Sequence, residues 1–135
     1  MSASSAFVLA ELPSHDLVQR IRRGLPAKTL DQVSKALGIS KTALAQKLGI
    51  ARRTVSRKNS EGKPLSPDVS EKVVRTARIL NLAKKIFTTD EAISQWLSQP
   101  DRALGDSAPF DLLDTDIGAR EVENLMRALS YGHFV

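Results

Sequence analysis

The chain has 135 residues, of which 41% are hydrophobic, and this composition is that of a folded protein with one good core or two small ones. It contains no cysteine, which excludes a disulfide framework and thiolate metal sites and fits a reducing cytoplasm. No apolar run approaches the ~20 residues of a membrane-spanning helix. Residues 1–10 lack the positive segment of a signal peptide, and we expect a loose arm there.

The formal net charge of +5 conceals two parts of opposite sign. Residues 1–87 carry 17 Lys and Arg against 6 Asp and Glu, a balance of +11, whereas residues 88–135 carry 3 against 9, a balance of −6. The basic part suits a polyanion such as nucleic acid. The acidic part would be repelled by DNA and suits another partner, although two solvated surfaces would give the same division.

Two amphipathic helices are predicted before residue 38. Ser14 is expected to cap the first, which ends at Gly24, and the second covers about residues 28–37 and stops at Gly38. The residues expected to face the core are Leu17, Val18 and Ile21 in the first helix and Leu30, Val33 and Leu37 in the second.

Residues 44–57 have the spacing of a helix-turn-helix. Leu44 and Leu48 lie one helical turn apart, and Ala45 between them allows a second helix to cross closely. Gly49 can adopt the left-handed conformation that ends the first helix. Val55 then points inward from a second helix with an arginine- and hydroxyl-rich outer face, the shape that enters a DNA major groove. A packed helical hairpin with a solvated basic face is the alternative.

The candidate DNA-contacting residues lie on the second helix of this motif and at the start of the first. Arginines can reach phosphates or guanine edges, and hydroxyl groups can bind phosphates. For the start of the first helix, which Ser40 is expected to cap, capping and solubility are equally good explanations. The predicted set is Lys41, Thr42, Arg52, Arg53, Thr54, Ser56, Arg57 and Lys58.

The rest of the chain also has helical periodicity. Ser66 and Pro67 form a helix start, and an apolar stripe continues to about Phe87, with Arg75, Arg78, Lys84 and Lys85 off that stripe. Thr88 with Glu91 predicts a capping box for the next helix, whose Trp96 is expected to pack in the core. After a turn-rich segment and a short helix at residues 110–113, Thr115 caps a last helix that buries Val122, Leu125, Met126 and Leu129 and ends at Gly132.

No alternating strand pattern occurs, so the sequence predicts an all-α fold. It also contains no glycine-rich phosphate loop and no Ser/His/Asp arrangement, and His15 and His133 lie near opposite ends. Asp111, Asp114 and Asp116 are better explained by helix capping and the helix dipole than by a metal. We therefore expect a protein without catalytic activity, cofactor or metal.

In this order, several blocks of sequence resemble the Xre/MbcA/ParS antitoxins, partners of RES-domain toxins. The resemblance covers residues 28–135 and does not extend to residues 1–27. The blocks are Leu37-Gly-Ile-Ser, Leu48-Gly-Ile-Ala-Arg-Arg-Thr, Gly62-Lys-Pro-Leu-Ser-Pro, Trp96-Leu97, Leu104-Gly105, Pro109-Phe-Asp-Leu-Leu and Tyr131-Gly132. One departure is Lys58, which stands where many helix-turn-helix units carry an aliphatic anchor.

The resemblance implies an Xre/Cro-like helix-turn-helix domain at residues 28–87 and a small helical toxin-binding domain at residues 88–135. Residues 1–27 would then be an N-terminal arm with a possible dimerisation helix. The first domain would bind operator DNA of the chain's own operon as a homodimer. The second would block a RES-domain toxin that degrades NAD, through the candidate residues Arg120, Ser130, Tyr131, Gly132, His133, Phe134 and Val135.

Two alternatives remain open from the sequence. Tyr131 and Phe134 suit a partner contact because aromatic side chains bury large areas, but they can also fold back onto the domain. The helix-turn-helix equally suits a stand-alone repressor whose second half serves dimerisation or sensing.

Overall fold

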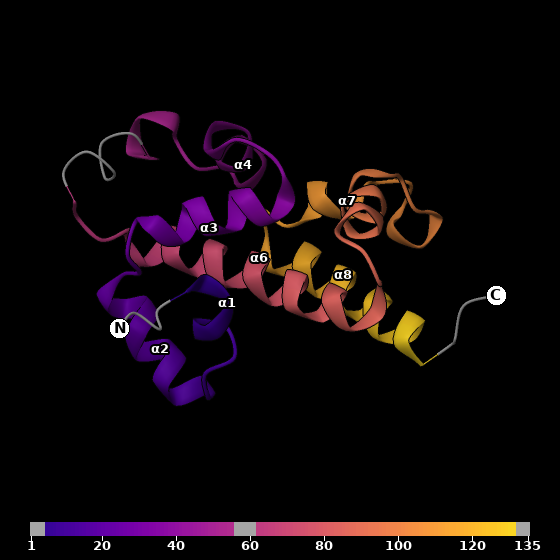
Figure 1. Ribbon diagram of the computed structural model, residues 1–135, viewed down its shortest axis with the longest axis horizontal. Coiled ribbons are helices and arrows are strands. Elements are labelled where there is room, and N and C mark those ends of the chain that lie inside the picture. Colours follow the sequence, from indigo (N-terminus) through magenta and orange to yellow (C-terminus); the bar gives the residue numbers. More distant parts are fainter. Residues whose placement is uncertain (1–4, 56–61, 132–135) are drawn as a thin grey trace.

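The fold is known from a computed structural model, which describes residues 5–55 and 62–131. Over these ranges the chain is helical and has no strand, apart from an isolated bridge between Asp101 and Ser107. In chain order the elements are α1 (Ala6–Leu9), α2 (Ser14–Arg23), α3 (Lys28–Leu37), α4 (Lys41–Leu48), α6 (Pro67–Ile86), α7 (Asp90–Ser98), the 3₁₀ turns η1 (Arg102–Leu104) and η2 (Pro109–Leu112), and α8 (Asp116–Ser130) (Figure 1).

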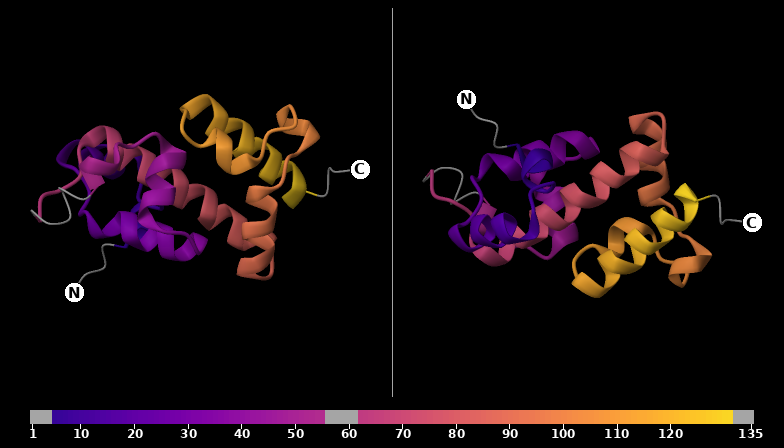
Figure 2. Two further views of the ribbon diagram at one scale, coloured as in Figure 1. Left: turned by 90° about the horizontal axis from the view of Figure 1, so that it is seen from above. Right: turned by 90° about the horizontal axis from the view of Figure 1, so that it is seen from below.

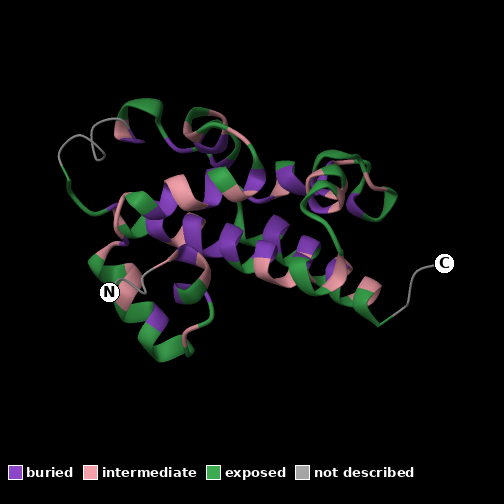
Figure 3. Ribbon diagram, viewed as in Figure 1, coloured by how far each residue is buried: buried purple, intermediate pink, exposed green. Residues whose placement is uncertain are grey.

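The long helix α6 is the centre of the arrangement. It contacts α1, α2, α3, α7 and α8, and Figure 2 shows α8 lying along a side of α6 that α1–α4 leave free. The Ser66 hydroxyl accepts a hydrogen bond from the Val69 amide, and Pro67 follows at the first helical position. Because neighbours cover it on several sides, α6 has more buried residues than any other described helix, and Figure 3 shows buried ribbon along much of its length.

The predicted helix at residues 28–37 is confirmed at both ends. Leu30, Val33 and Leu37 are buried, and Gly38 ends the helix with a φ of 72°. The predicted caps Ser40 and Thr115 are also confirmed, since their hydroxyls accept hydrogen bonds from Ala43 and Gly118. None of the described helices is long and apolar enough to cross a bilayer.

The expectation of a loose arm at residues 1–10 is wrong for its described part. Ser5 caps α1 through the Val8 amide, and Ala6 and Leu9 are buried. The Ala6 amide donates to Gln32 Oε1 at 2.8 Å, and the Asn81 amide donates to the carbonyl of Phe7 at 3.0 Å. A helix this short has no intrinsic stability, so only these tertiary contacts hold it in place.

Three local predictions differ from the structure by one position or one face. Pro13, not Ser14, occupies the N-cap of α2, and no side chain caps that helix. Val18 is 43% exposed, because α2 contacts its neighbours along a narrow stripe that includes Leu17. The cap of α7 is Thr89, whose hydroxyl accepts from Ala92, so Thr88 forms no capping box.

Trp96 is half-buried and packs against the core. Its ring lies 5.7 Å from that of Phe87, centroid to centroid, with the two planes inclined by 40°. The prediction that Trp96 packs in the core is therefore confirmed in part, since some of its surface remains accessible.

The junction between α2 and α3 permits a test of the packing. Gly24 has a φ of 89°, and a Cβ there would lie 2.2 Å from the carbonyl oxygen of Leu65, whereas a Cβ at Gly38 would meet nothing within 4 Å. We predict that Gly38→Ala lowers the free energy of unfolding by about 1 kcal/mol, from backbone strain alone. Gly24→Ala should cost about 1–3 kcal/mol more, from the clash. Equal urea midpoints for the two variants would contradict the close approach.

Candidate functional site

The helix-turn-helix is formed as predicted as far as residue 55. Gly49 ends α4 in the left-handed conformation, with a φ of 71°, and the Ile50 amide donates to the carbonyl of Ala45 at 2.7 Å. Residues 52–55 are helical, and Val55 is 9% exposed. Ile50 and Val55 thus fix the second helix of the motif to the core. The opposite face of this helix is exposed to solvent.

The described residues of that face are accessible cations and a hydroxyl. Arg52 and Arg53 are exposed, and Thr54 is half-buried. In the described part of the chain, no carboxylate lies within 4.0 Å of either guanidinium. Ser56, Arg57 and Lys58 lie outside the described residues. Two unpaired arginines on a projecting helix are suited to contact phosphates or guanine edges.

The two candidates on α4 differ in their surroundings. Lys41 Nζ lies 3.2 Å from Asp31 Oδ1, so this ammonium already joins α4 to α3. Thr42 is exposed. The ion pair with Asp31 gives Lys41 a role within the fold. Contact with DNA stays a prediction for both Lys41 and Thr42.

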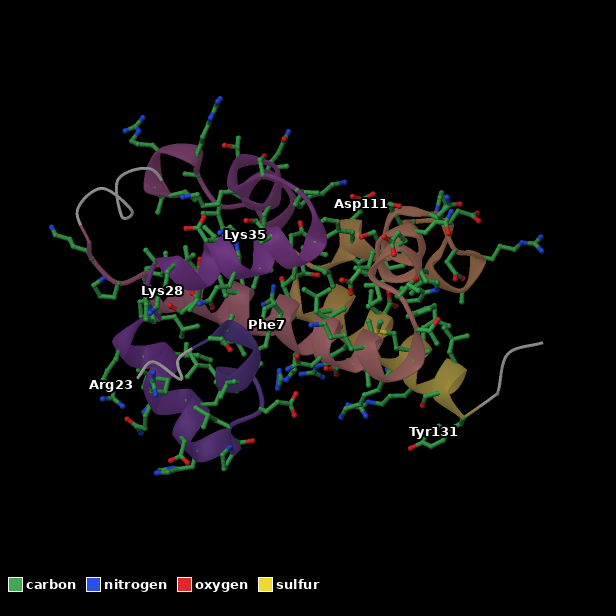
Figure 4. The ribbon with its side chains drawn as sticks, viewed as in Figure 1. Phe7, Arg23, Lys28, Lys35, Asp111 and Tyr131 are labelled. Carbon is green, nitrogen blue, oxygen red and sulfur yellow. The ribbon has the colours of Figure 1, made fainter. Side chains whose placement is uncertain are left out.

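The candidate partner-binding residues lie on α8 and after it. Arg120 forms an exposed ion pair with Asp116 at 3.1 Å. The Ser130 hydroxyl donates to the carbonyl of Arg127, and Tyr131, which follows the last helical residue, is 72% exposed. Gly132, His133, Phe134 and Val135 lie outside the described residues. Figure 4 shows Tyr131 directed away from the helices, so at this position the chain does not fold back into the core.

Ile117 is an exposed apolar residue that the sequence analysis did not single out. It lies in the first turn of α8 and is 75% exposed. It lies at the opposite end of α8 from Tyr131, and both side chains are exposed. The sequence could have predicted this exposure, because Ile117 lies off the apolar stripe that contains Val122 and Met126.

Arg75 joins the two charge-distinct parts of the chain. The sequence analysis placed it off the buried stripe of α6, but it is only 8% exposed. Its NH1 group donates to the carbonyl of Leu113 at 3.0 Å and its NH2 group to Glu71 Oε1 at 2.6 Å, whereas its Nε has no partner. The long side chain becomes buried because α8 packs on α6 and the carbonyl of Leu113, the residue after η2, accepts from the guanidinium.

A second link is more exposed. Lys47 of α4 forms an ion pair with Asp111 of η2, and its ammonium lies 5.7 Å from the centre of the Phe110 ring. Asp111 therefore has a specific partner, besides the helix-end role that the sequence predicted. Because both side chains are nearly half exposed, the pair contributes no more than about 1 kcal/mol. In the described residues, no group of three or more His, Cys, Asp and Glu side chains forms a metal site.

Two family models match consecutive parts of the chain. Residues 16–78 match the family described as "Antitoxin Xre-like helix-turn-helix domain", and residues 82–132 match the "Antitoxin Xre/MbcA/ParS C-terminal toxin-binding domain". Both the helix-turn-helix and the region that ends in Tyr131 are therefore recognised independently of the structure.

Individual relatives give the same result. The chain is 30% identical to "Antitoxin Xre" of Yersinia enterocolitica over 119 residues, which covers 87% of this chain and 80% of that protein. It is also 30% identical to the "Prs ADP-ribosylating antitoxin" of a Sphingobium species, over 88% of this chain and 80% of that protein. Among solved structures, a chain in the crystal structure of the M. tuberculosis MbcT–MbcA toxin–antitoxin complex shares the fold, with a TM-score of 0.60 and 21% identity over 81% of this chain and 96% of that chain.

The buried guanidinium gives a second prediction. Arg75→Ala should lower the free energy of unfolding by about 2–3 kcal/mol, because it removes packing and leaves the Leu113 carbonyl without its donor. Arg78→Ala, which removes an exposed arginine from the same helix, should change it by less than about 0.5 kcal/mol. Urea unfolding of both variants checks the difference. If the two losses were equal, Arg75 would not hold α8 and η2 against α6.

Proposed function

Because the chain belongs to the Xre antitoxin family, we propose that it neutralises a RES-domain toxin that degrades NAD and represses its own operon by binding operator DNA. In this proposal residues 28–87 bind DNA and residues 88–135 bind the toxin. The match of residues 82–132 to a toxin-binding domain is the observation that carries it. The chain would act in the cytoplasm, as a binding protein without catalytic activity.

The proposed mechanism of neutralisation is steric. Tyr131 extends from the end of α8 with most of its surface accessible, and four more residues follow it. An aromatic side chain buries a large area with few rotatable bonds, and Gly132 allows the backbone to approach a partner closely. Arg120 and Ser130 would contact the toxin beside its active-site entrance.

The proposed DNA contact is made by Arg52 and Arg53, with Thr54 and the residues that follow. The basic balance of residues 1–87 supports this assignment, since a positive surface raises affinity for a polyanion. A homodimer is part of the proposal, because one short recognition helix reads too few base pairs for specificity and two-fold operators suit two-fold proteins.

Two other readings make different predictions. A stand-alone repressor would have no toxin partner, and the match to a toxin-binding domain counts against it. The relative described as "Prs ADP-ribosylating antitoxin" favours a second toxin chemistry, in which the ADP-ribose of NAD is transferred to Prs and not to water. Both reactions release nicotinamide, so the test follows the ADP-ribose of labelled NAD. Incubating the purified partner with labelled NAD should give free ADP-ribose without Prs if water is the acceptor, and label attached to Prs if Prs is the acceptor.

The tail predicts a specific loss of neutralisation. Deleting residues 131–135 should raise the antitoxin concentration needed for half-inhibition of NAD breakdown by at least about tenfold, since a buried aromatic anchor contributes more than ~1 kcal/mol. Tyr131→Ala should give part of this loss. Val8→Ser, which removes an exposed apolar side chain from α1, is the matched control and should leave inhibition unchanged. Full protection by the truncated chain would exclude the tail mechanism.

DNA binding predicts a steep dependence on salt. The affinity of the full chain for a duplex from its own promoter should fall linearly on a log–log plot against salt concentration. Arg52→Gln with Arg53→Gln should weaken binding and reduce that slope by about one for each lost phosphate contact. Fluorescence anisotropy between ~50 and ~300 mM salt measures both quantities. A complex that is insensitive to salt would contradict a basic DNA-binding face.

A further inference from the structure

A second basic surface lies outside the helix-turn-helix, where α2 ends and α3 begins. Residues 20–28 read Arg-Ile-Arg-Arg-Gly-Leu-Pro-Ala-Lys and contain no acidic residue. Arg22, Arg23 and Lys28 are exposed, and we refer to these three as the α2–α3 basic cluster. The predicted DNA-binding set does not include these three residues, because that set was taken from residues 41–58.

The fold fixes this cluster to the segment that follows the recognition helix. The Leu65 amide donates to the carbonyl of Leu25 at 2.8 Å, and the Leu25 amide donates to the Ser70 hydroxyl at 2.8 Å. Gly24 lies so close to Leu65 that a Cβ would clash with its carbonyl oxygen. The α2–α3 junction is therefore held against Leu65 and the first turn of α6. Figure 4 shows Arg23 and Lys28 along the same edge of the molecule.

Intramolecular roles account for only part of these charges. In the described part of the chain, no carboxylate lies within 4.0 Å of Arg22, Arg23 or Lys28. The two arginines stabilise the negative C-terminal end of α2. Lys28, however, is the first residue of α3, where the helix dipole favours an acidic residue and disfavours a cation. Lys28 therefore adds no helix-dipole stabilisation to α3, and its charge lies exposed.

We propose that the α2–α3 basic cluster binds the phosphate backbone of the same duplex whose major groove receives the recognition helix. This inference rests on the DNA-binding half of the proposed function and extends it to residues 22–28. Contacts of this kind position a protein on DNA and carry no sequence information. The cluster therefore adds affinity for any duplex, whereas Arg52 and Arg53 supply discrimination between sequences.

The test uses the full chain and two duplexes of about 30 bp, one from the promoter of its own gene and one with the same bases scrambled. Arg22→Gln/Arg23→Gln is compared with Lys85→Gln/Arg102→Gln, which removes two exposed charges from other parts of the molecule. The cluster variant should bind both duplexes more weakly by the same factor, about tenfold or more at ~0.1 M salt. Its log–log salt slope should be smaller by about 2, and the control should keep the wild-type slope.

Further variants keep the result interpretable. Lys28→Gln alone should reduce the slope by about 1, and Arg22→Lys/Arg23→Lys should keep it, because both charges remain. Circular dichroism checks that each variant melts as the wild type does. Sedimentation velocity should show an unchanged oligomeric state, since a loss of self-association would assign the cluster to an acidic surface of a second copy and overturn the proposal.

The remaining outcomes are distinct. If the cluster variant and its control have the same slope while the wild type binds DNA in a salt-dependent way, the cluster has no phosphate contact and the proposed function stands without it. If the wild type binds neither duplex, the DNA-binding half of the proposed function fails together with this inference.

Discussion

The burial of α6 is the constraint on which the rest of the structure depends. A twenty-residue helix with neighbours on several sides must present small or apolar side chains in several directions, and Val73, Ala77 and Ala83 are fully buried on it. Each neighbouring helix is short and gains most of its stability from this packing. The helix-turn-helix and the C-terminal region are therefore parts of one continuous core, in which α6 is shared.

The same sharing explains why a charged side chain is buried. Arg75 lies where α8 and η2 pack on α6, and it satisfies the carbonyl of Leu113 while it pairs with Glu71. An apolar residue would leave that carbonyl without a donor. The exposed Lys47–Asp111 pair adds little energy, so the relative position of the two regions depends mainly on apolar packing and on Arg75.

The two candidate surfaces lie far apart on this scaffold. Tyr131 lies at the opposite end of the molecule from Arg23 and Lys28 (Figure 4). Gly24, beside Arg23, contacts Leu65, which follows the recognition helix in the sequence. A partner on the tail and a duplex on the basic edge therefore need not compete for the same surface. The charge division has the same direction along the chain, since residues 1–87 have a balance of +11 and residues 88–135 a balance of −6.

The sequence by itself determined the all-helical class, the helix-turn-helix and the caps at Ser40, Ser66 and Thr115, because these depend on interactions within one or two turns. Tertiary structure decided the rest. It ordered α1, turned Val18 to solvent, buried Arg75 and fixed the α2–α3 junction against Leu65. These outcomes depend on contacts between residues far apart in the chain, such as Asn81 with Phe7 and Leu65 with Leu25, which local periodicity does not encode.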